Sequence, residues 1–269
     1  MPTDTCTMPP PTLSPAGTPL LHIAHGRAPI TLNRPAHHTR LHVEDLQSLQ
    51  QHFKTIAADP AIQVLVLTGT GTSFCSGFHL GSLNESPRAS STGPQLFEQT
   101  VEALEALPQP TVCRLNGGVY GGAIDLALAC DFRIGVASAS MRMPAVRLGL
   151  HYYPSGLRRY VSRLGLSAAK QLFLLAETLP AETMLRLGVL DRMTSAEGLD
   201  AAVQEVLDAL CAGAPLAMRG MKASLNEIAR GDADSAVLRQ REQHCADSDD
   251  LREGKAANAE RRTARFVGR

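Results

Sequence analysis

A glycine pair followed by an acid is the part of this sequence best suited to chemistry. Gly121 and Gly122 open an apolar run with helical spacing, and Asp125 follows within the first turn. Glycine lets the backbone approach a ligand closely, and the N–H groups at a helix start lack internal partners and carry partial positive charge. Such amides can stabilise a negative oxygen that forms during a reaction. The segment therefore predicts an oxyanion-binding helix start with an acid or base close by. A buried structural role for Asp125, capping its helix, is the alternative.

Composition limits the classes of function. The chain has 269 residues, 44% of them hydrophobic, and 26 basic residues balance 26 acidic ones. Balanced charge argues against broad attraction to nucleic acid or to a membrane surface. No apolar run approaches the roughly 18 residues of a membrane span, and the first residues lack a secretory signal pattern. The six cysteines show no CxxC spacing, so we predict reduced thiols in a cytoplasmic protein.

Histidines are the other residues that invite a chemical interpretation. His37, His38 and His42 lie close together, but no cysteine or acid with ligand spacing completes a set. We therefore predict no metal site.

Alternating strand and helix patterns predict an α/β core followed by helices. The Pro- and Thr-rich residues 1–18 are predicted to form a disordered arm, residues 19–195 the core, and residues 196–269 a helical C-terminal region. Predicted strands cover residues 20–24, 29–33, 64–68, 111–115 and 132–136. Predicted helices cover residues 43–57, 94–107, 156–164, 167–176, 180–187, 198–212, 215–230, 232–247 and 249–262.

Two glycine motifs together resemble those of the crotonase (enoyl-CoA hydratase/isomerase) superfamily. They are Phe74-Cys-Ser-Gly-Phe-His-Leu80 and the run from Asn116 to Ile134 that contains Gly121-Gly122. Asn33-Arg34-Pro35, Leu148-Gly149 with Arg159, and the closing Glu253-Gly254 with Arg261-Arg262 fit the same pattern. The resemblance covers about residues 20–269. It implies a crotonase-like spiral of ββα turns with a helical C-terminal trimerisation region, and a homotrimer or dimer of trimers. It also implies an acyl-CoA substrate of the kind used in fatty acid metabolism, with coenzyme A as part of the substrate and no tightly bound cofactor.

The resemblance also assigns roles to residues. The backbone amides of Phe78 and Gly122 would form the oxyanion hole. Ser76, Phe78 and Leu80 would contact the acyl-CoA, and Arg40 would lie near the CoA phosphates. Arg261, expected in the last helix, would approach the CoA of a neighbouring subunit.

This sequence departs from the hydratase pattern at both catalytic acids. The first family glutamate falls on Asp125, whose side chain is shorter by one C–C bond, about 1.5 Å. The second falls on Ala145, so the two-carboxylate mechanism for adding water lacks one group.

Tyr152, within His151-Tyr152-Tyr153, resembles the methylmalonyl-CoA decarboxylase branch, which also lacks the second glutamate. There a tyrosine could orient the departing carboxylate, although packing alone would also explain a tyrosine. The nucleophilic aspartate of haloaryl-CoA dehalogenases would fall on Tyr153, which disfavours that chemistry.

Three hypotheses therefore remain. The leading one is an enoyl-CoA hydratase/isomerase-type lyase that acts through a stabilised enolate. The second is a malonyl-type acyl-CoA decarboxylase, and the third is a non-catalytic CoA-binding scaffold.

Overall fold

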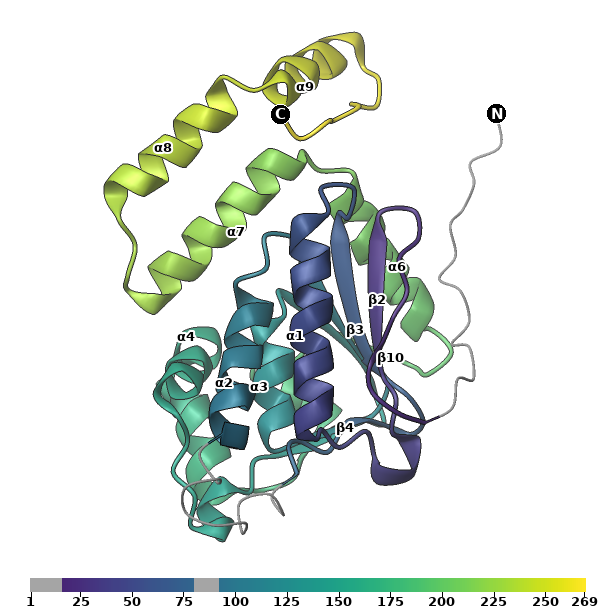
Figure 1. Ribbon diagram of the computed structural model, residues 1–269, viewed down its shortest axis with the longest axis vertical. Helices are drawn as coiled ribbons and strands as arrows, with labels where there is room; N and C mark the ends of the chain where they lie inside the picture. Colours follow the sequence, from purple (N-terminus) through teal and green to yellow (C-terminus); the bar gives the residue numbers. More distant parts are fainter. Residues whose placement is uncertain (1–15, 80–91) are drawn as a thin grey trace.

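The computed structural model describes residues 16–79 and 92–269 of the chain (Figure 1). Most of the arm predicted over residues 1–18, and the predicted contact residue Leu80, lie outside these ranges.

Two sheets form the core, and successive turns of the chain add one strand to each. The larger sheet has the strand order β1-β2-β3-β5-β7-β10 and the smaller one β4-β6-β8-β9. Neighbours are parallel except in the β1–β2 and β8–β9 pairs. The strands are β1 (Leu20–Leu21), β2 (Arg27–Leu32), β3 (Val64–Gly69), β4 (Ser73–Cys75), β5 (Thr111–Leu115), β6 (Gly118–Tyr120), β7 (Phe132–Val136), β8 (Ser140–Arg142), β9 (Leu179–Pro180) and β10 (Arg192–Thr194). The order β3, β4, helix, β5, β6, helix is the ββα turn that the resemblance to the crotonase superfamily implies.

Helices cover both faces of the larger sheet. The helices α1 (Val43–Ala58), α2 (Thr92–Glu105) and α3 (Gly122–Ala129) lie side by side on one face, and α6 (Leu199–Cys211) lies on the other (Figure 1). This double cover explains why β3 begins with the continuous apolar run Val64–Leu67, since parallel strands buried on both faces need no polar side.

The region after β8 is mainly helical, as predicted, but it also contributes the short strands β9 and β10, which the sequence did not predict. Residues 156–164 and 167–176 were predicted to form two helices, and α4 (Pro154–Lys170), which continues as a π-helical turn, Gln171–Leu175, is interrupted between these two stretches. Gly165 has a φ of 79°, so the expected break is present as a local kink. Beyond it, α5 (Ala181–Arg186) precedes β10.

The last three helices, α7 (Pro215–Arg230), α8 (Ser235–Ala246) and α9 (Asp249–Glu260), stand at one end of the molecule (Figure 1). The helix α9 ends at Glu260, so the prediction that Arg261 lies in it was wrong by one residue. Arg261 has a φ of 53° and turns the chain back. The returning tail is held because the Asp250 carboxylate accepts hydrogen bonds from the amides of Val267 and Gly268.

Within the described ranges, no single helix combines the length and hydropathy of a membrane span, and α6 and α7 meet these criteria only as a pair bent by 106°.

Candidate active site

Two glycine bends lie directly against each other at the ends of β4 and β6. Gly77 has a φ of 93° and Gly121 a φ of 54°, conformations that residues with a Cβ rarely adopt. A Cβ added to Gly77 would lie 2.8 Å from the carbonyl oxygen of Tyr120 and 3.3 Å from the nitrogen of Gly122. The two bends therefore approach so closely that only hydrogen fits between them, which brings Phe78 beside the start of α3.

The hydrogen bonds of the first bend aim the Phe78 amide away from its neighbouring segment. Leu41 donates its N–H to Gly77 and accepts one from His79, at 2.9 and 2.8 Å. In this parallel bridge the N–H of the intervening residue, Phe78, points to the opposite side. No acceptor for it occurs among residues 16–79 and 92–269. Gly122 is the first residue of α3, so its N–H also has no partner inside the helix. Two unpaired amides from different bends thus lie close to one another.

Asp125 lies in the first turn of α3 and is fully buried. One carboxylate oxygen, Oδ1, accepts a hydrogen bond from Arg159 Nη1 at 2.8 Å, and the other, Oδ2, accepts one from the hydroxyl of Tyr153. Burial raises the pKa of Asp125, while the guanidinium of Arg159 and the Tyr153 hydroxyl act against that shift. Both oxygens of this acid are therefore already engaged by side chains of the 153–159 segment.

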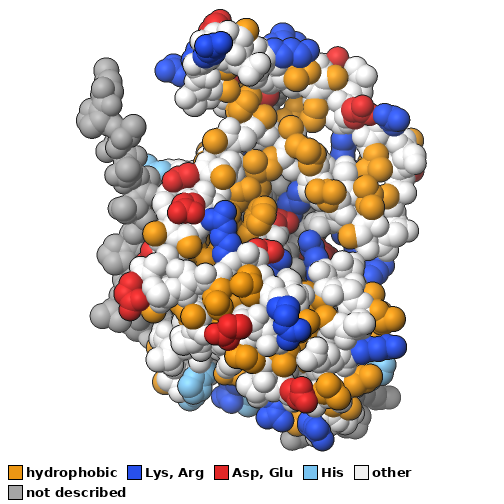
Figure 2. Space-filling model, turned by 180° about the vertical axis from the view of Figure 1, so that it is seen from behind, with side chains coloured by type: hydrophobic (Ala, Val, Ile, Leu, Met, Phe, Trp, Pro, Cys, Tyr) orange, Lys and Arg blue, Asp and Glu red, His pale blue; other side chains and the backbone are white. Residues whose placement is uncertain are grey.

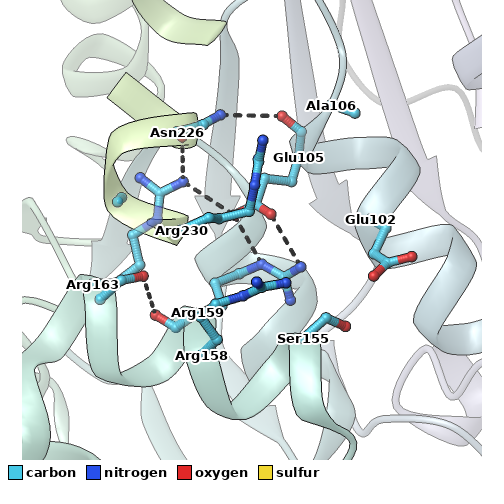
Figure 3. A pocket seen from close by; sticks show the side chains of 11 residues that line it. Glu102, Glu105, Ala106, Ser155, Arg158, Arg159, Arg163, Asn226 and Arg230 are labelled. Carbon is cyan, nitrogen blue, oxygen red and sulfur yellow. Dashed lines mark hydrogen bonds and ion pairs between the residues drawn. The ribbon is translucent and has the colours of Figure 1, made fainter. Parts of the chain in front are cut away.

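Arg159 is shared between Asp125 and a second acid on α2. Its Nε and Nη2 donate to the two oxygens of Glu105 at 3.0 and 3.2 Å, and only 3% of the residue is exposed. Burial would raise the pKa of Glu105, but the charges of Arg159 and Arg163 bring it below its ordinary value. Figure 3 shows these groups on the wall of a cavity of about 230 Å³ between α2, α4 and α7, where Asn226 and Arg230 face them. The polar network thus runs from Asp125 to a solvent-open cavity.

Aromatic rings join the glycine bends to Asp125. The ring of Phe97 packs against Gly122, where an added Cβ would lie 2.8 Å from it. The Phe97 centroid is 6.0 Å from that of Phe78 and 6.3 Å from that of Tyr153, and Tyr152 stacks on Tyr153 at 4.4 Å. The Tyr152 hydroxyl lies 3.5 Å from that of Tyr153. Burial and the nearby Asp125 charge raise the pKa of both phenols, so both remain protonated near neutral pH. Phe78, Gly122, Asp125 and Tyr152, all singled out from the sequence, thus lie in one continuous cluster.

Three partners in this cluster were missed by sequence reasoning. Tyr153 and Arg159, both named in the sequence motifs, lie 28 and 34 residues from Asp125, and Phe97 carries no motif. The available signal was that Arg159 lies in the second turn of a predicted helix that the tyrosine pair precedes. Ala145, at the position of the second family acid, is buried in the 3-10 turn Ala145–Leu148.

The residues expected to bind CoA are partly brought together. Ser76 adjoins the first bend, and its N–H donates to the carbonyl of His38 at 2.9 Å. Arg40 lies one residue before Leu41, and its Nε is buried without an acceptor within the described part of the chain. Arg261 follows α9 at the other end of the molecule from β4, so one chain does not bring it to the site (Figure 1).

The histidines adopt other roles in the described ranges. His42 precedes α1, and its ring lies 4.8 Å from that of His79. Burial, with the charge of Arg34, lowers the pKa of His42. No group of three or more histidine, cysteine or acidic residues suited to a metal ion occurs in residues 16–79 and 92–269.

Comparison with known proteins matches almost the whole chain. The family model described as enoyl-CoA hydratase/isomerase matches residues 22–269. A crotonyl-CoA hydratase of Syntrophomonas wolfei is 29% identical over 90% of this chain and 95% of its own length. A Bacillus subtilis protein whose name assigns it to this family is 31% identical over 89% of this chain and 94% of its own. The crystal structure of an enoyl-CoA hydratase from Bacillus anthracis superposes with a TM-score of 0.86, at 26% identity, over 94% of this chain and all of that one. These matches confirm the predicted fold class and the resemblance to the crotonase superfamily.

Proposed function

Because the chain belongs to the enoyl-CoA hydratase/isomerase family, we propose that it hydrates a 2-enoyl-CoA through an enolate held by the amides of Phe78 and Gly122. The crotonyl-CoA hydratase among its relatives supports a short enoyl-CoA as the first substrate to test.

The close approach of the two glycine bends carries this proposal. A Cβ at Gly77 would lie only 3.3 Å from the nitrogen of Gly122, and the Phe78 N–H points away from Leu41. Two amides directed at one thioester oxygen would stabilise the negative charge that forms when water adds to the β-carbon. Each such donor contributes about 3–4 kcal/mol in enzymes of known mechanism.

Asp125 supplies the acid–base chemistry in this proposal. It lies on the same helix as Gly122, three residues and therefore about 4.5 Å of helix rise away. A single carboxylate would be the final acceptor of the proton lost by water and the source of the proton for the α-carbon, because Ala145 offers no second acid.

The experiment follows loss of the conjugated thioester absorbance of crotonyl-CoA. Turnover by the unmodified protein, reduced at least 10²-fold by Asp125→Asn, supports the proposal. Asp200→Asn is the matched control, since that exposed acid pairs with Arg114 away from the site. Full activity of Asp125→Asn would remove Asp125 from the mechanism. Thermal stabilisation by CoA without turnover on any acyl-CoA would instead favour a non-catalytic CoA-binding scaffold.

One observation favours a second candidate, decarboxylation of a malonyl-type acyl-CoA. Both oxygens of Asp125 are engaged, by Arg159 and Tyr153, so neither is free to bind water in this conformation. Loss of CO2 next to a thioester also yields a thioester enolate, which the same two amides could hold, and this step needs no base. Release of CO2 from methylmalonyl-CoA, with no action on crotonyl-CoA, would establish this reaction. Tyr152→Phe should then reduce turnover without weakening CoA binding.

We further propose that Arg40 and Ser76 contact the CoA portion of the substrate and that the chain works as a homotrimer, or a dimer of trimers, in the cytoplasm. The buried Arg40 Nε without a described acceptor supports an anionic ligand there. Exposed Met221, Leu225 and Ile228 on α7, 56% to 65% accessible, support burial of that helix by another subunit. Figure 2 shows apolar side chains gathered on the reverse face below the C-terminal helices. Sedimentation equilibrium would test the assembly, and a monomer would contradict it.

A further inference from the structure

The hydroxyl of Tyr153 extends the reach of an acid that is otherwise enclosed. Asp125 is fully buried, and its Oδ1 is occupied by Arg159. Its Oδ2 accepts a hydrogen bond from the hydroxyl of Tyr153, whose side chain is only half-buried. An aspartate also reaches about 1.5 Å less far than a glutamate. A proton can therefore enter or leave Asp125 most directly through the phenol that contacts it.

The position of Tyr153 relative to the two amides fits such a role. The Phe97 ring packs on Gly122 and also meets the Tyr153 ring in an edge-to-face contact, at a centroid distance of 6.3 Å. The Tyr153 side chain thus contacts Asp125 directly and lies one aromatic ring away from Gly122 at the start of α3.

We propose that Tyr153 is a catalytic residue that carries a proton between the reacting carbons and Asp125, with Arg159 as the positioning residue of that acid. This inference rests on the proposed hydration of an enoyl-CoA. In this inference the tyrosine hydroxyl contacts the substrate, and the Asp125 carboxylate exchanges protons only with that hydroxyl.

The proton transfers balance as a shuttle. Water forms a C–O bond to the β-carbon and gives one proton to the Tyr153 oxygen, while the Tyr153 proton passes to Asp125 Oδ2. The electron pair of the double bond moves toward the thioester oxygen, giving the enolate. The transfers then reverse: the Tyr153 proton bonds to the α-carbon with the enolate electron pair, and Asp125 returns its proton to Tyr153. One water has been added, and both side chains regain their starting forms.

Arg159 determines which oxygen of Asp125 exchanges protons with Tyr153. Because Arg159 holds Oδ1 and is itself fixed by two hydrogen bonds to Glu105, only Oδ2 is presented to Tyr153. The arrangement orients the acid through a buried charge that does not touch the substrate.

The test compares two phenylalanine variants. Tyr153→Phe should lower kcat on crotonyl-CoA by about 10²-fold or more, with KM and thermal midpoint close to those of the unmodified protein. Tyr160→Phe is the matched control, because its hydroxyl is buried without a hydrogen-bond partner in the described ranges and its ring belongs to the same aromatic cluster. A Tyr153→Phe variant with kcat within threefold of the unmodified enzyme, or an equal loss in Tyr160→Phe, would overturn the proposal.

A double variant tests whether the two groups act as one unit. If Tyr153 and Asp125 form one relay, Tyr153→Phe combined with Asp125→Asn should lose no more activity than the less active of the two single variants. Losses that multiply would show independent roles and refute the relay.

A measurement on the unmodified protein needs no folded variant. The dependence of kcat on the deuterium fraction of the solvent should be curved, because two protons move in one step. A linear dependence would exclude the relay. If the unmodified protein converts no acyl-CoA, the proposed function itself fails, which is distinct from a failure of the Tyr153 assignment alone.

Discussion

The substitution Arg159→Met removes the positive charge that links Asp125 in the site to Glu105 on α2. The guanidinium makes one hydrogen bond to Asp125 and two to Glu105, and the side chains of Arg159, Asp125 and Glu105 are 2%, 0% and 11% exposed. Methionine keeps most of the volume but leaves two buried carboxylates without their main cation. Removing one partner from a buried ion pair typically costs 3–5 kcal/mol, so we expect the free energy of unfolding to fall by about 3–5 kcal/mol near pH 8.

The loss should depend on pH in a defined direction. The unfolded carboxyls ionise near their ordinary pKa values of 3.8 and 4.5. Without Arg159, the pKa of folded Asp125, already raised by burial, rises further, and that of Glu105 rises from its lowered value. The folded variant then holds protons that the unfolded chain releases, so its stability falls as pH increases above these ordinary values. Each unit of pKa change corresponds to about 1.4 kcal/mol, and the deficit near pH 5 should be smaller by at least this amount.

Urea denaturation at pH 5 and pH 8 measures both quantities. Arg192→Met is the control, since Arg192 and its partner Glu205 are 50% and 72% exposed and such pairs contribute less than about 1 kcal/mol. An equal loss at the two pH values, or a loss no larger than that of the control, would refute the reasoning.

Three further predictions concern the glycine bend, the thiols and the tail. Gly77→Ala should lower kcat/KM at least 10²-fold in the crotonyl-CoA assay, because the added methyl group would separate the two bends; Gly149→Ala, also at positive φ but with open space around it, should retain activity. Burial raises the pKa of Cys75 to about 12, so iodoacetamide near pH 8, mapped by mass spectrometry, should leave Cys75 unmodified while labelling the half-buried Cys245; equal labelling would contradict the packing. Asp250→Ala should release the tail and speed amide hydrogen exchange in residues 261–269, whereas unchanged exchange would show that other contacts hold it.

The sequence predicted the long elements well because their signals are local. The strands Thr111–Leu115 and Phe132–Val136 and the helix Pro215–Arg230 match their predicted bounds. The smaller sheet was not predicted, because β4, β6, β8 and β9 have only two or three residues each, too few for an alternating pattern to be read. These strands form through pairing with distant segments.

The features of the candidate site also divide into those with a local sequence signal, which were predicted, and those that depend on distant contacts, which were not. The glycine motifs identified the two bends, and the acid within the first turn of α3 followed from its position. The sequence did not predict that Asp125 is enclosed, because Arg159 reaches it from α4 and Tyr153 from the position just before α4. Glu105 joins this network from α2. Whether an acid is free or engaged depends on such tertiary contacts, which spacing along the chain does not encode.

The sharing of Arg159 has a consequence for how this protein can diverge. One cation serves two acids on different helices, so replacing the arginine alone leaves both acids without their main cation, whereas replacing either acid alone leaves a one-to-one ion pair. The acids can therefore change before the arginine, but the arginine cannot be lost while both acids remain without a large cost in stability. Homologues that lack the arginine should therefore carry uncharged residues at the positions of Asp125 and Glu105. In such homologues a residue at another position would have to accept and return the proton.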